Sequence, residues 1–205
     1  MRSAWILMLA ASLFAGCSGD PVSPYTSGTD SDTDTDTDSD SDADAGDPLE
    51  DCDPSAENWP AEWAAMEAQV VDLVNDVRAE GADCGDAGVF DAAEPLVMEP
   101  HLQCAARVHS LDMGTRNYFD HDSFDGPLGN TFFERVANAG YQGIALNENI
   151  SAGEDNAAGT VEMWIGPGET CAKIMNPDAL ETGVGFAAVE GSVWTNYWTQ
   201  DFGSP

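Results

Sequence analysis

Four cysteines and three histidines carry much of the chemistry that the sequence offers beyond its first fifty residues. They are Cys52, Cys84, Cys104, Cys171, His101, His109 and His121. No CxxC motif occurs and the histidines lie away from any cysteine cluster, so the spacing does not favour a structural zinc site. The sequence contains neither G-x-S-x-G nor H-E-x-x-H, which are short motifs of serine hydrolases and zinc peptidases. In an exported protein, four cysteines predict two disulfides.

The N-terminus predicts export. A basic Arg2 precedes the apolar run WILMLAASLF at residues 5–14, which is too short for a transmembrane helix. Residues 1–16 therefore read as a signal peptide. The run ends in LFAGC, which resembles the bacterial lipobox, in which the cysteine is acylated and becomes the first mature residue. This implies lipidation at Cys17, and the alternative is an ordinary signal peptide with a chance cysteine. Ser18 after that cysteine resembles the Gram-negative sorting signal for the outer membrane.

Residues 17–54 predict an extended tether. They contain SGTDSDTDTDTDSDSDADAGD, an alternating acidic tract with almost nothing apolar. Such a tract cannot bury enough surface to offset chain entropy, so we expect disorder. Calcium binding by the D-x-D spacing is the alternative, but the Gly and Glu that complete a calcium loop are missing. At ~3.3–3.6 Å per residue the segment reaches on the order of 100 Å.

Charge restricts the class of partner. The chain carries a formal net charge of −32. From residue 55 onward there are 25 acidic and 5 basic residues, a net of −20. This negative charge repels phosphate backbones and anionic headgroups, so we do not expect the protein to bind nucleic acid. Divalent cations, cationic partners and neutral ligands remain compatible with it.

Residues 55–205 have the length of one domain with a sizeable core. Helical periodicity predicts helices over 60–80, 102–117 and 131–139, and the start of a fourth at 158–163. Residues 184–189 and 193–202 alternate apolar and polar side chains around Glu190-Gly191-Ser192, which predicts a β-hairpin. Residues 81–100 are expected to form a loop. Helices followed by strands indicate an α+β fold with helices packed on an antiparallel sheet.

Seven stretches, in this order and spacing, resemble one family. They are LVNDVRAEGADCG, LQCAARVHSLDMGTRNYFDHDSFDG, RVANAGY, NENISAG, W-x₆-CAKIMNP, GVGF and YWTQDFG. They are similar to the CAP superfamily (cysteine-rich secretory proteins, antigen 5 and pathogenesis-related proteins), also called SCP domains, and above all to its bacterial secreted branch. The resemblance covers about residues 62–204. It implies a three-layer α-β-α sandwich with a central antiparallel sheet, stapled by disulfides.

The resemblance also implies a disulfide pairing. Cys84 and Cys104 lie where bacterial members often carry a linked pair. Cys52 and Cys171 are then left to pair with each other. A bridge across the loop of about 20 residues between Cys84 and Cys104 contributes roughly 3 kcal/mol in the chain-entropy model.

CAP domains typically carry a cleft of two histidines and two glutamates that can hold a divalent metal. His121 in YFDH matches the first histidine, and Glu148 in NENI matches the first glutamate. Thr170 stands at the position of the second histidine, and Pro167 at that of the second glutamate. His121, Glu148 and Glu169 are therefore the candidate ligands of a zinc or calcium ion, in an incomplete set.

Each candidate also has a plain structural interpretation. His121 can close a helix–loop junction by bonding to Glu148, and Glu148 can cap a turn at 147–150. His109 lies on the apolar face of its helix and is expected to be a core histidine with its hydrogen bonds satisfied, whereas His101 is expected at the surface. The aromatic residues at the end of the chain are expected to pack in the core rather than to form a binding platform.

Three functions follow as hypotheses. The favoured one is a lipoprotein of the cell envelope that displays the domain as a non-enzymatic binding module for a lipid, a small ligand or a protein. The second is a peptidase- or esterase-like hydrolase in which His121, polarised by Glu148, activates water or the hydroxyl of Ser123 or Ser151. The third is a structural envelope protein with a vestigial cleft.

Overall fold

The computed structural model describes residues 52–53, 56 and 58–205. The predicted signal peptide at 1–16, lipidation at Cys17 and most of the acidic tether lie outside these residues. A four-stranded sheet has the order β3-β5-β6-β4. Its strands are β3 (Val97–Met98), β4 (Ile144–Ala152), β5 (Glu181–Ala188) and β6 (Asn196–Ser204). β4, β6 and β5 pair antiparallel, and the two-residue β3 adds a parallel edge to β5.

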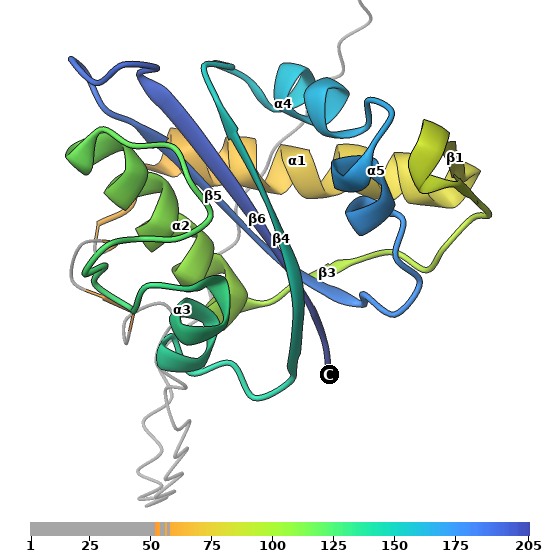
Figure 1. Cartoon of the computed structure of the whole chain (residues 1–205), viewed down its shortest axis with the longest axis horizontal. Coiled ribbons are helices and arrows are strands. Elements are labelled where there is room, and N and C mark those ends of the chain that lie inside the picture. Colours follow the sequence, from red (N-terminus) through yellow and green to blue (C-terminus); the bar gives the residue numbers. More distant parts are fainter. Residues whose placement is uncertain (1–51, 54–55, 57) are drawn as a thin grey trace, which may run out of the picture. The chain divides into compact units, whose positions relative to one another are not determined.

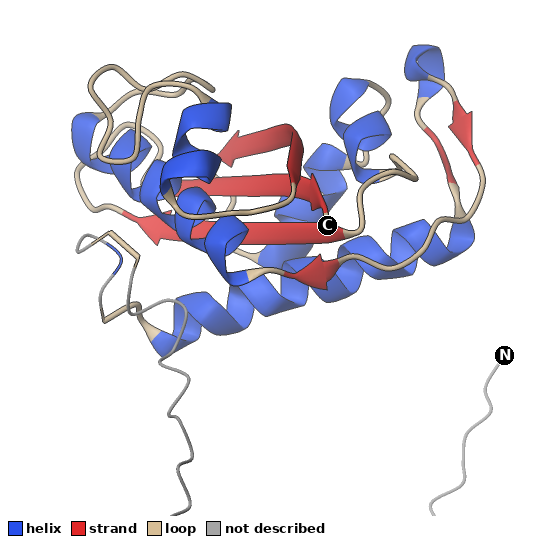
Figure 2. Cartoon of the chain, turned by 90° about the horizontal axis from the view of Figure 1, so that it is seen from below, coloured by secondary structure: helices blue, strands red, loops and turns tan. Residues whose placement is uncertain are grey.

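Helices cover both faces of this sheet (Figures 1 and 2). One layer holds α1 (Ala61–Glu80), α4 (Ala157–Trp164) and α5 (Glu169–Ile174), and the other holds α2 (Pro100–Arg116) and α3 (Phe132–Asn138). The predicted α+β fold and its three-layer α-β-α arrangement are confirmed. The four helices expected from periodicity are present, and their ends differ from the expected ones by one or two residues. The predicted hairpin is β5 and β6.

Strand β5 shows how alternation in the sequence builds the layers. Val184 and Phe186 point to the α1 layer, where they join a buried cluster with Val70, Val74 and Trp198. Gly183 and Gly185 point to the other face, and a Cβ atom on either would overlap the backbone of α2 at Leu102 and Ala106. The two glycines therefore let α2 lie directly on the sheet.

Side chains cap the starts of α2 and α3, and a left-handed residue ends α2. The Glu99 carboxylate caps α2 by accepting from the Leu102 N–H at 2.7 Å, with Pro100 at the first helical position. Asn117 ends α2 in the left-handed conformation, at φ 59°. Thr131 and Glu134 form a capping box at the start of α3.

Three segments differ from the expectation. The predicted turn at 147–150 is the middle of strand β4, which pairs with β6 along nearly its whole length. The predicted loop at 81–100 contains a small hairpin, β1 (Ala82–Asp83) with β2 (Val89–Phe90), as well as β3. Helix α5 is not predicted by the sequence pattern at all. All three are short or irregular in sequence, so tertiary pairing rather than local periodicity determines them.

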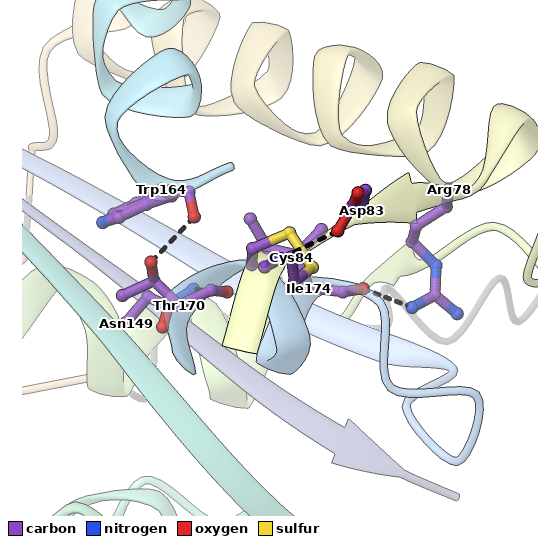
Figure 3. The surroundings of a disulfide bond; sticks show 9 residues. Arg78, Asp83, Cys84, Asn149, Trp164, Thr170 and Ile174 are labelled. Carbon is purple, nitrogen blue, oxygen red and sulfur yellow. Dashed lines mark hydrogen bonds between the residues drawn. A yellow bond between two sulfur atoms is a disulfide. The ribbon is translucent and has the colours of Figure 1, made fainter. Parts of the chain in front are cut away.

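The disulfide pairing also differs. The structure joins Cys52 to Cys104 and Cys84 to Cys171, so the predicted pairs Cys84–Cys104 and Cys52–Cys171 are wrong. Cys104 belongs to α2, on the far face of the sheet from the buried cluster that contains Cys84 and Cys171. The sheet therefore separates Cys84 from Cys104. Figure 3 shows the Cys84 bridge among Trp164, Ile174 and Thr170, where it ties the β1–β2 region to α5.

Candidate functional site

The site begins with His121, which lies in the loop between α2 and α3. Its Nδ1 is 2.7 Å from Oε1 of Glu148, the contact expected from sequence. The His121 side chain is 50% exposed, whereas that of Glu148 is 2% exposed. Because a carboxylate accepts hydrogen bonds, Nδ1 carries the proton and Nε2 is left as an acceptor. His121 thus joins a buried acid to the solvent.

Glu148 occupies β4, the edge strand of the sheet. Its Oε2 accepts from the Arg135 guanidinium at 2.6 Å, and Arg135 also donates to the His121 carbonyl at 2.9 Å. The Lys173 ammonium donates to the Glu148 carbonyl at 2.9 Å, on the open edge. Burial alone raises the pKa of Glu148, but the hydrogen bond from His121 and the positive charge of Arg135 outweigh it and lower that pKa. Glu148 is therefore an ionised carboxylate.

Asp201 stands directly opposite Glu148 in the β4–β6 register. It is fully buried, so desolvation, followed by the nearby Glu148 charge, raises its pKa well above the usual range. Arg135 forms an ion pair with Glu148, so the negative charge resides on Glu148 and disfavours ionisation of its buried neighbour. Asp201 is accordingly the neutral member of the pair.

His109 and Ser123 lie behind this pair. His109 is fully buried, its Nε2–H donates to the Asp120 carbonyl at 3.0 Å, and its Nδ1 accepts from the Ser123 hydroxyl at 3.3 Å. Burial lowers the pKa of His109 to about 4, so the ring is neutral at neutral pH. The prediction of a satisfied core histidine is confirmed.

The two serines proposed to act with His121 lie elsewhere. Ser123 is buried and bonded to His109 and to the Tyr118 hydroxyl. Ser151 is also buried, and its hydroxyl donates to the Met163 sulfur. Neither hydroxyl bonds to His121. A nucleophile for His121 would therefore have to come from water or from the substrate.

The third proposed metal ligand does not join the pair. Glu169 is the exposed first residue of α5. Thr170, at the position of the second family histidine, donates its hydroxyl to the Trp164 carbonyl at 2.7 Å (Figure 3). Within the part of the chain that the structure describes, no three His, Cys, Asp or Glu side chains gather so as to hold a metal ion. The donor set of His121 and Glu148 does not fit zinc or calcium on its own.

Arg135 and Asp201 were missed from the sequence. Arg135 occupies a short helix in which a basic residue has no distinguishing neighbour. Asp201 was a faint signal, because it is the one acid in strand β6, where the other buried residues are apolar or uncharged. An acid at a buried strand position has a structural or chemical role more often than a chance one.

The aromatic residues near the end of the chain confirm the core interpretation. Tyr197, Trp198 and Phe202 are fully buried, on the two covered faces of β6. Trp194 lies before the strand and is 41% exposed, with its ring centroid 5.6 Å from that of Phe119. His101 is partly exposed, as expected, and its Nδ1 lies 2.7 Å from Glu99. No described helix has both the length and the apolar character needed to span a membrane.

Comparison with known proteins places this geometry in a family. The chain is 30% identical over 136 residues to the uncharacterised protein YkwD of Bacillus subtilis, a match that covers 66% of this chain and 48% of that protein. The chain thus spans about half the length of this curated relative.

Two solved structures share the fold. An extracellular protein containing an SCP domain from Bacillus anthracis has a TM-score of 0.54 at 24% identity, over 69% of this chain and 41% of that one. An outer surface protein of Borrelia burgdorferi has a TM-score of 0.51 at 15% identity, over 69% and 90%. At these identities the likeness shows the fold alone. Residues 71–202 match the model of the cysteine-rich secretory protein family, CAP, and the chain therefore belongs to that family.

Proposed function

We propose that this chain is an exported lipoprotein that displays its CAP domain at the cell envelope as a non-enzymatic binding module. The observation that carries the proposal is the arrangement around Glu148. His121 and Arg135 both bond to that one buried carboxylate, and Asp201 stands opposite it in the strand register. What the site offers to the solvent is the Nε2 edge of a half-exposed imidazole, with no serine hydroxyl and no third metal ligand from the described residues bonded to it.

Charge narrows the class of ligand. The basic side chains of the described residues are committed to internal partners: Arg78 to backbone carbonyls, Arg107 to Glu67, Arg116 to Asp112, Arg135 to Glu148 and Lys173 to a carbonyl. The 25 acids from residue 55 onward leave a surface that repels anions. We therefore expect a neutral or cationic ligand with a donor that can reach His121 Nε2.

Display at the envelope rests on the first 54 residues and on the relatives. LFAGC at 13–17 has the pattern of a lipidation signal, and the acidic tract after it is long enough to hold the domain clear of a membrane. Two of the similar structures are described as an extracellular protein and an outer surface protein, which supports export of this chain. Cys17→Ser should move the folded protein from the membrane fraction to the soluble fraction. A soluble wild type, or a variant that stays with the membrane, would contradict the anchor.

The binding role is tested with the intact chain labelled with ¹⁵N. Zinc, calcium, neutral lipid micelles and small amines are titrated separately, and amide shifts are followed. We expect a saturable ligand whose affinity falls at least tenfold in His121→Ala. Phe124→Ala is the matched control, because it removes an 82% exposed side chain from the same loop. The proposal would be overturned if both variants bound the ligand equally weakly, or if the wild-type chain bound none of the probes saturably.

One observation favours a hydrolase as the second candidate. The 2.7 Å contact between His121 and Glu148 is the carboxylate–imidazole pair that makes a histidine a general base. In that case water takes the place of the absent serine. A peptidase and esterase screen in which turnover is abolished by His121→Ala and kept by Phe124→Ala would replace the binding module with this enzyme.

A further inference from the structure

A hollow of about 340 Å³ lies beside the N-terminal end of α2. It is formed where α2 and β5 begin and β6 ends, and the α3–β4 loop closes one side. The side chains that matter to its chemistry are Glu99, His101, Tyr141 and Glu181. None of them takes part in the His121 site, so the hollow is a separate feature of the surface.

Tyr141 lines one side of this hollow and fixes the position of Glu181. Its hydroxyl donates to Oε2 of Glu181 at 2.6 Å. The ring lies against Gly143 and Gly203, and a Cβ atom at either glycine would overlap the phenol. The two glycines thus make the room that lets the tyrosine reach Glu181. The carboxylate is held in place rather than free to rotate into solvent.

Glu99 forms the facing side and is equally fixed. One oxygen accepts from the Leu102 N–H at 2.7 Å, and the other lies 2.7 Å from Nδ1 of His101. Its side chain is 16% exposed. Burial, followed by the hydrogen bond and charge of Glu181 and the charge of Glu99, raises the pKa of Tyr141. Both carboxylates therefore act on the same small volume.

No lysine or arginine in the described ranges lines the hollow. Arg135 and Lys173, like the other three basic residues of the domain, are bonded to partners elsewhere. The hollow consequently presents two fixed carboxylates and no internal Lys or Arg counter-charge. A metal ion does not fit, because the described side chains supply no three-ligand group there. An organic cation needs only hydrogen-bond acceptors and room for a short stem.

We propose that this hollow binds a single organic cation, a primary ammonium or a guanidinium group, between Glu99 and Glu181. The volume is at the small end of the range for small-ligand sites, which suits one such group with its alkyl stem. The negative field of the domain concentrates cations at its surface, and the two fixed carboxylates select a donor-rich head. A free alkylamine and a lysine or arginine side chain of a peptide share this chemistry. The site does not depend on the role proposed for His121.

The test is a titration of the ¹⁵N-labelled intact chain with four probes. n-Butylammonium and n-butylguanidinium represent free cations, and N-acetyl-lysine amide represents a peptide side chain. N-acetyl-norleucine amide has a similar stem without the charge. We expect the cations to produce saturable amide shifts at residues 99, 101, 102, 141–143 and 181, and the norleucine derivative to leave these signals unchanged. Stronger binding of the free amine or of the lysine derivative identifies the natural source.

Glu181→Gln removes one charge of the site while keeping an acceptor for Tyr141, and should weaken binding about tenfold, which corresponds to 1.4 kcal/mol. Asp72→Asn removes one charge from the exposed face of α1 and should change binding less than twofold. Tyr141→Phe, which frees Glu181, serves as a second variant and should also weaken binding, with folding checked by its amide spectrum. Equal effects of Glu181→Gln and Asp72→Asn, or shifts that do not saturate, would overturn the proposal.

Discussion

The two edges of the sheet each carry a buried glutamate paired with an arginine, and the two pairs differ in what surrounds them. At the β5 edge, Glu67 of α1 meets Arg107 of α2 at 2.6 Å. Because β3 pairs only with the first two residues of β5, the Phe186 N–H is unpaired along this edge and donates to Glu67 at 3.0 Å. The Trp59 indole N–H and the Gln103 amide also donate hydrogen bonds to the Glu67 carboxylate. All of these partners are internal.

At the β4 edge, Glu148 meets Arg135 at the same distance, 2.6 Å. Here the next partner is His121, whose side chain is half exposed. The Arg135 Nε and both Asp201 carboxylate oxygens find no donor or acceptor partner of the usual kind, which leaves unused hydrogen-bonding capacity around Glu148. We call the β5 edge, with Glu67 and Arg107, the closed edge, and the β4 edge, with Glu148 and Arg135, the open edge. A buried pair whose hydrogen bonds are all internal stabilises the fold, whereas a pair that reaches solvent through an imidazole is suited to meet a ligand.

The largest expected effect is at the closed edge. Glu67→Ala should lower the free energy of unfolding by about 3–5 kcal/mol, because it leaves Arg107 buried without its carboxylate. The Phe186 N–H also loses its acceptor. Urea unfolding at pH 7 measures the loss. Glu62→Ala, on the exposed side of the same helix, is the control and should cost less than about 1 kcal/mol. A loss of the same small size in both variants would mean that the closed edge does not hold the layers together.

The second effect concerns pH and belongs to the open edge. His109 has a pKa of about 4 in the fold, against an unfolded value of about 6.5. Below pH 6.5 the His109 ring binds a proton in the unfolded chain but stays neutral in the folded one. The contribution of His109 to the free energy of unfolding is therefore lost as the pH falls towards 4. The loss amounts to about 3 kcal/mol at ~1.36 kcal/mol per pKa unit.

His109→Gln should remove this slope, and comparison of urea midpoints at pH 7, 5.5 and 4 measures it. Glu67 works in the opposite sense, because burial, partly offset by Arg107, raises its pKa. The stability that Glu67 contributes is present below its unfolded value of about 4.3 and is lost as the pH rises through its folded one. An unchanged slope between pH 6.5 and 4 in His109→Gln would assign the acid sensitivity to another group.

A smaller effect distinguishes the two edges, because neutralising a buried acid should change the stability in opposite directions at the two edges. The raised pKa of Asp201 means that the fold keeps a proton that the unfolded chain loses above about pH 3.9. Stability from this group is therefore present in acid and lost as the pH rises. Asp201→Asn has nearly the same shape and is neutral at every pH. We expect it to raise stability at pH 7 by on the order of 1 kcal/mol, and to have no effect near pH 3. Glu67→Gln should lower stability at pH 7, and a loss in both variants would show that Asp201 is ionised in the fold.

The sequence predicts the closed edge less well than the open one. The open edge is visible because YFDH and NENI lie in a recognisable order, and the His121–Glu148 contact follows from it. Glu67 is one acid among several on an amphipathic helix, and nothing local marks it as buried. Its burial depends on where β3 stops pairing with β5, which is a tertiary feature.

The disulfides illustrate the same limit. The resemblance to the family pairs Cys84 with Cys104, yet the sheet lies between them. Pairing is decided by the layer to which each cysteine belongs, and the short helix α5, which carries Cys171, has no periodic signal of its own. Long helices and the β5–β6 hairpin were predictable because their apolar positions repeat over many residues. The edge strand β4 was not, because polar side chains occupy much of the strand that carries the site.

The smallest effect on stability and the largest on binding should come from one residue, His121. His121→Ala removes a hydrogen bond at a half-exposed position, while Arg135 still holds Glu148, so the free energy of unfolding should fall by about 1 kcal/mol or less. Arg107→Ala, the matched removal of a glutamate's partner at the closed edge, should cost several times more because Glu67 would remain buried and unpaired. Thermal unfolding of both variants gives this ratio. If His121→Ala proved as costly as Arg107→Ala, His121 would be part of the framework, and the open edge would differ from the closed one only in exposure.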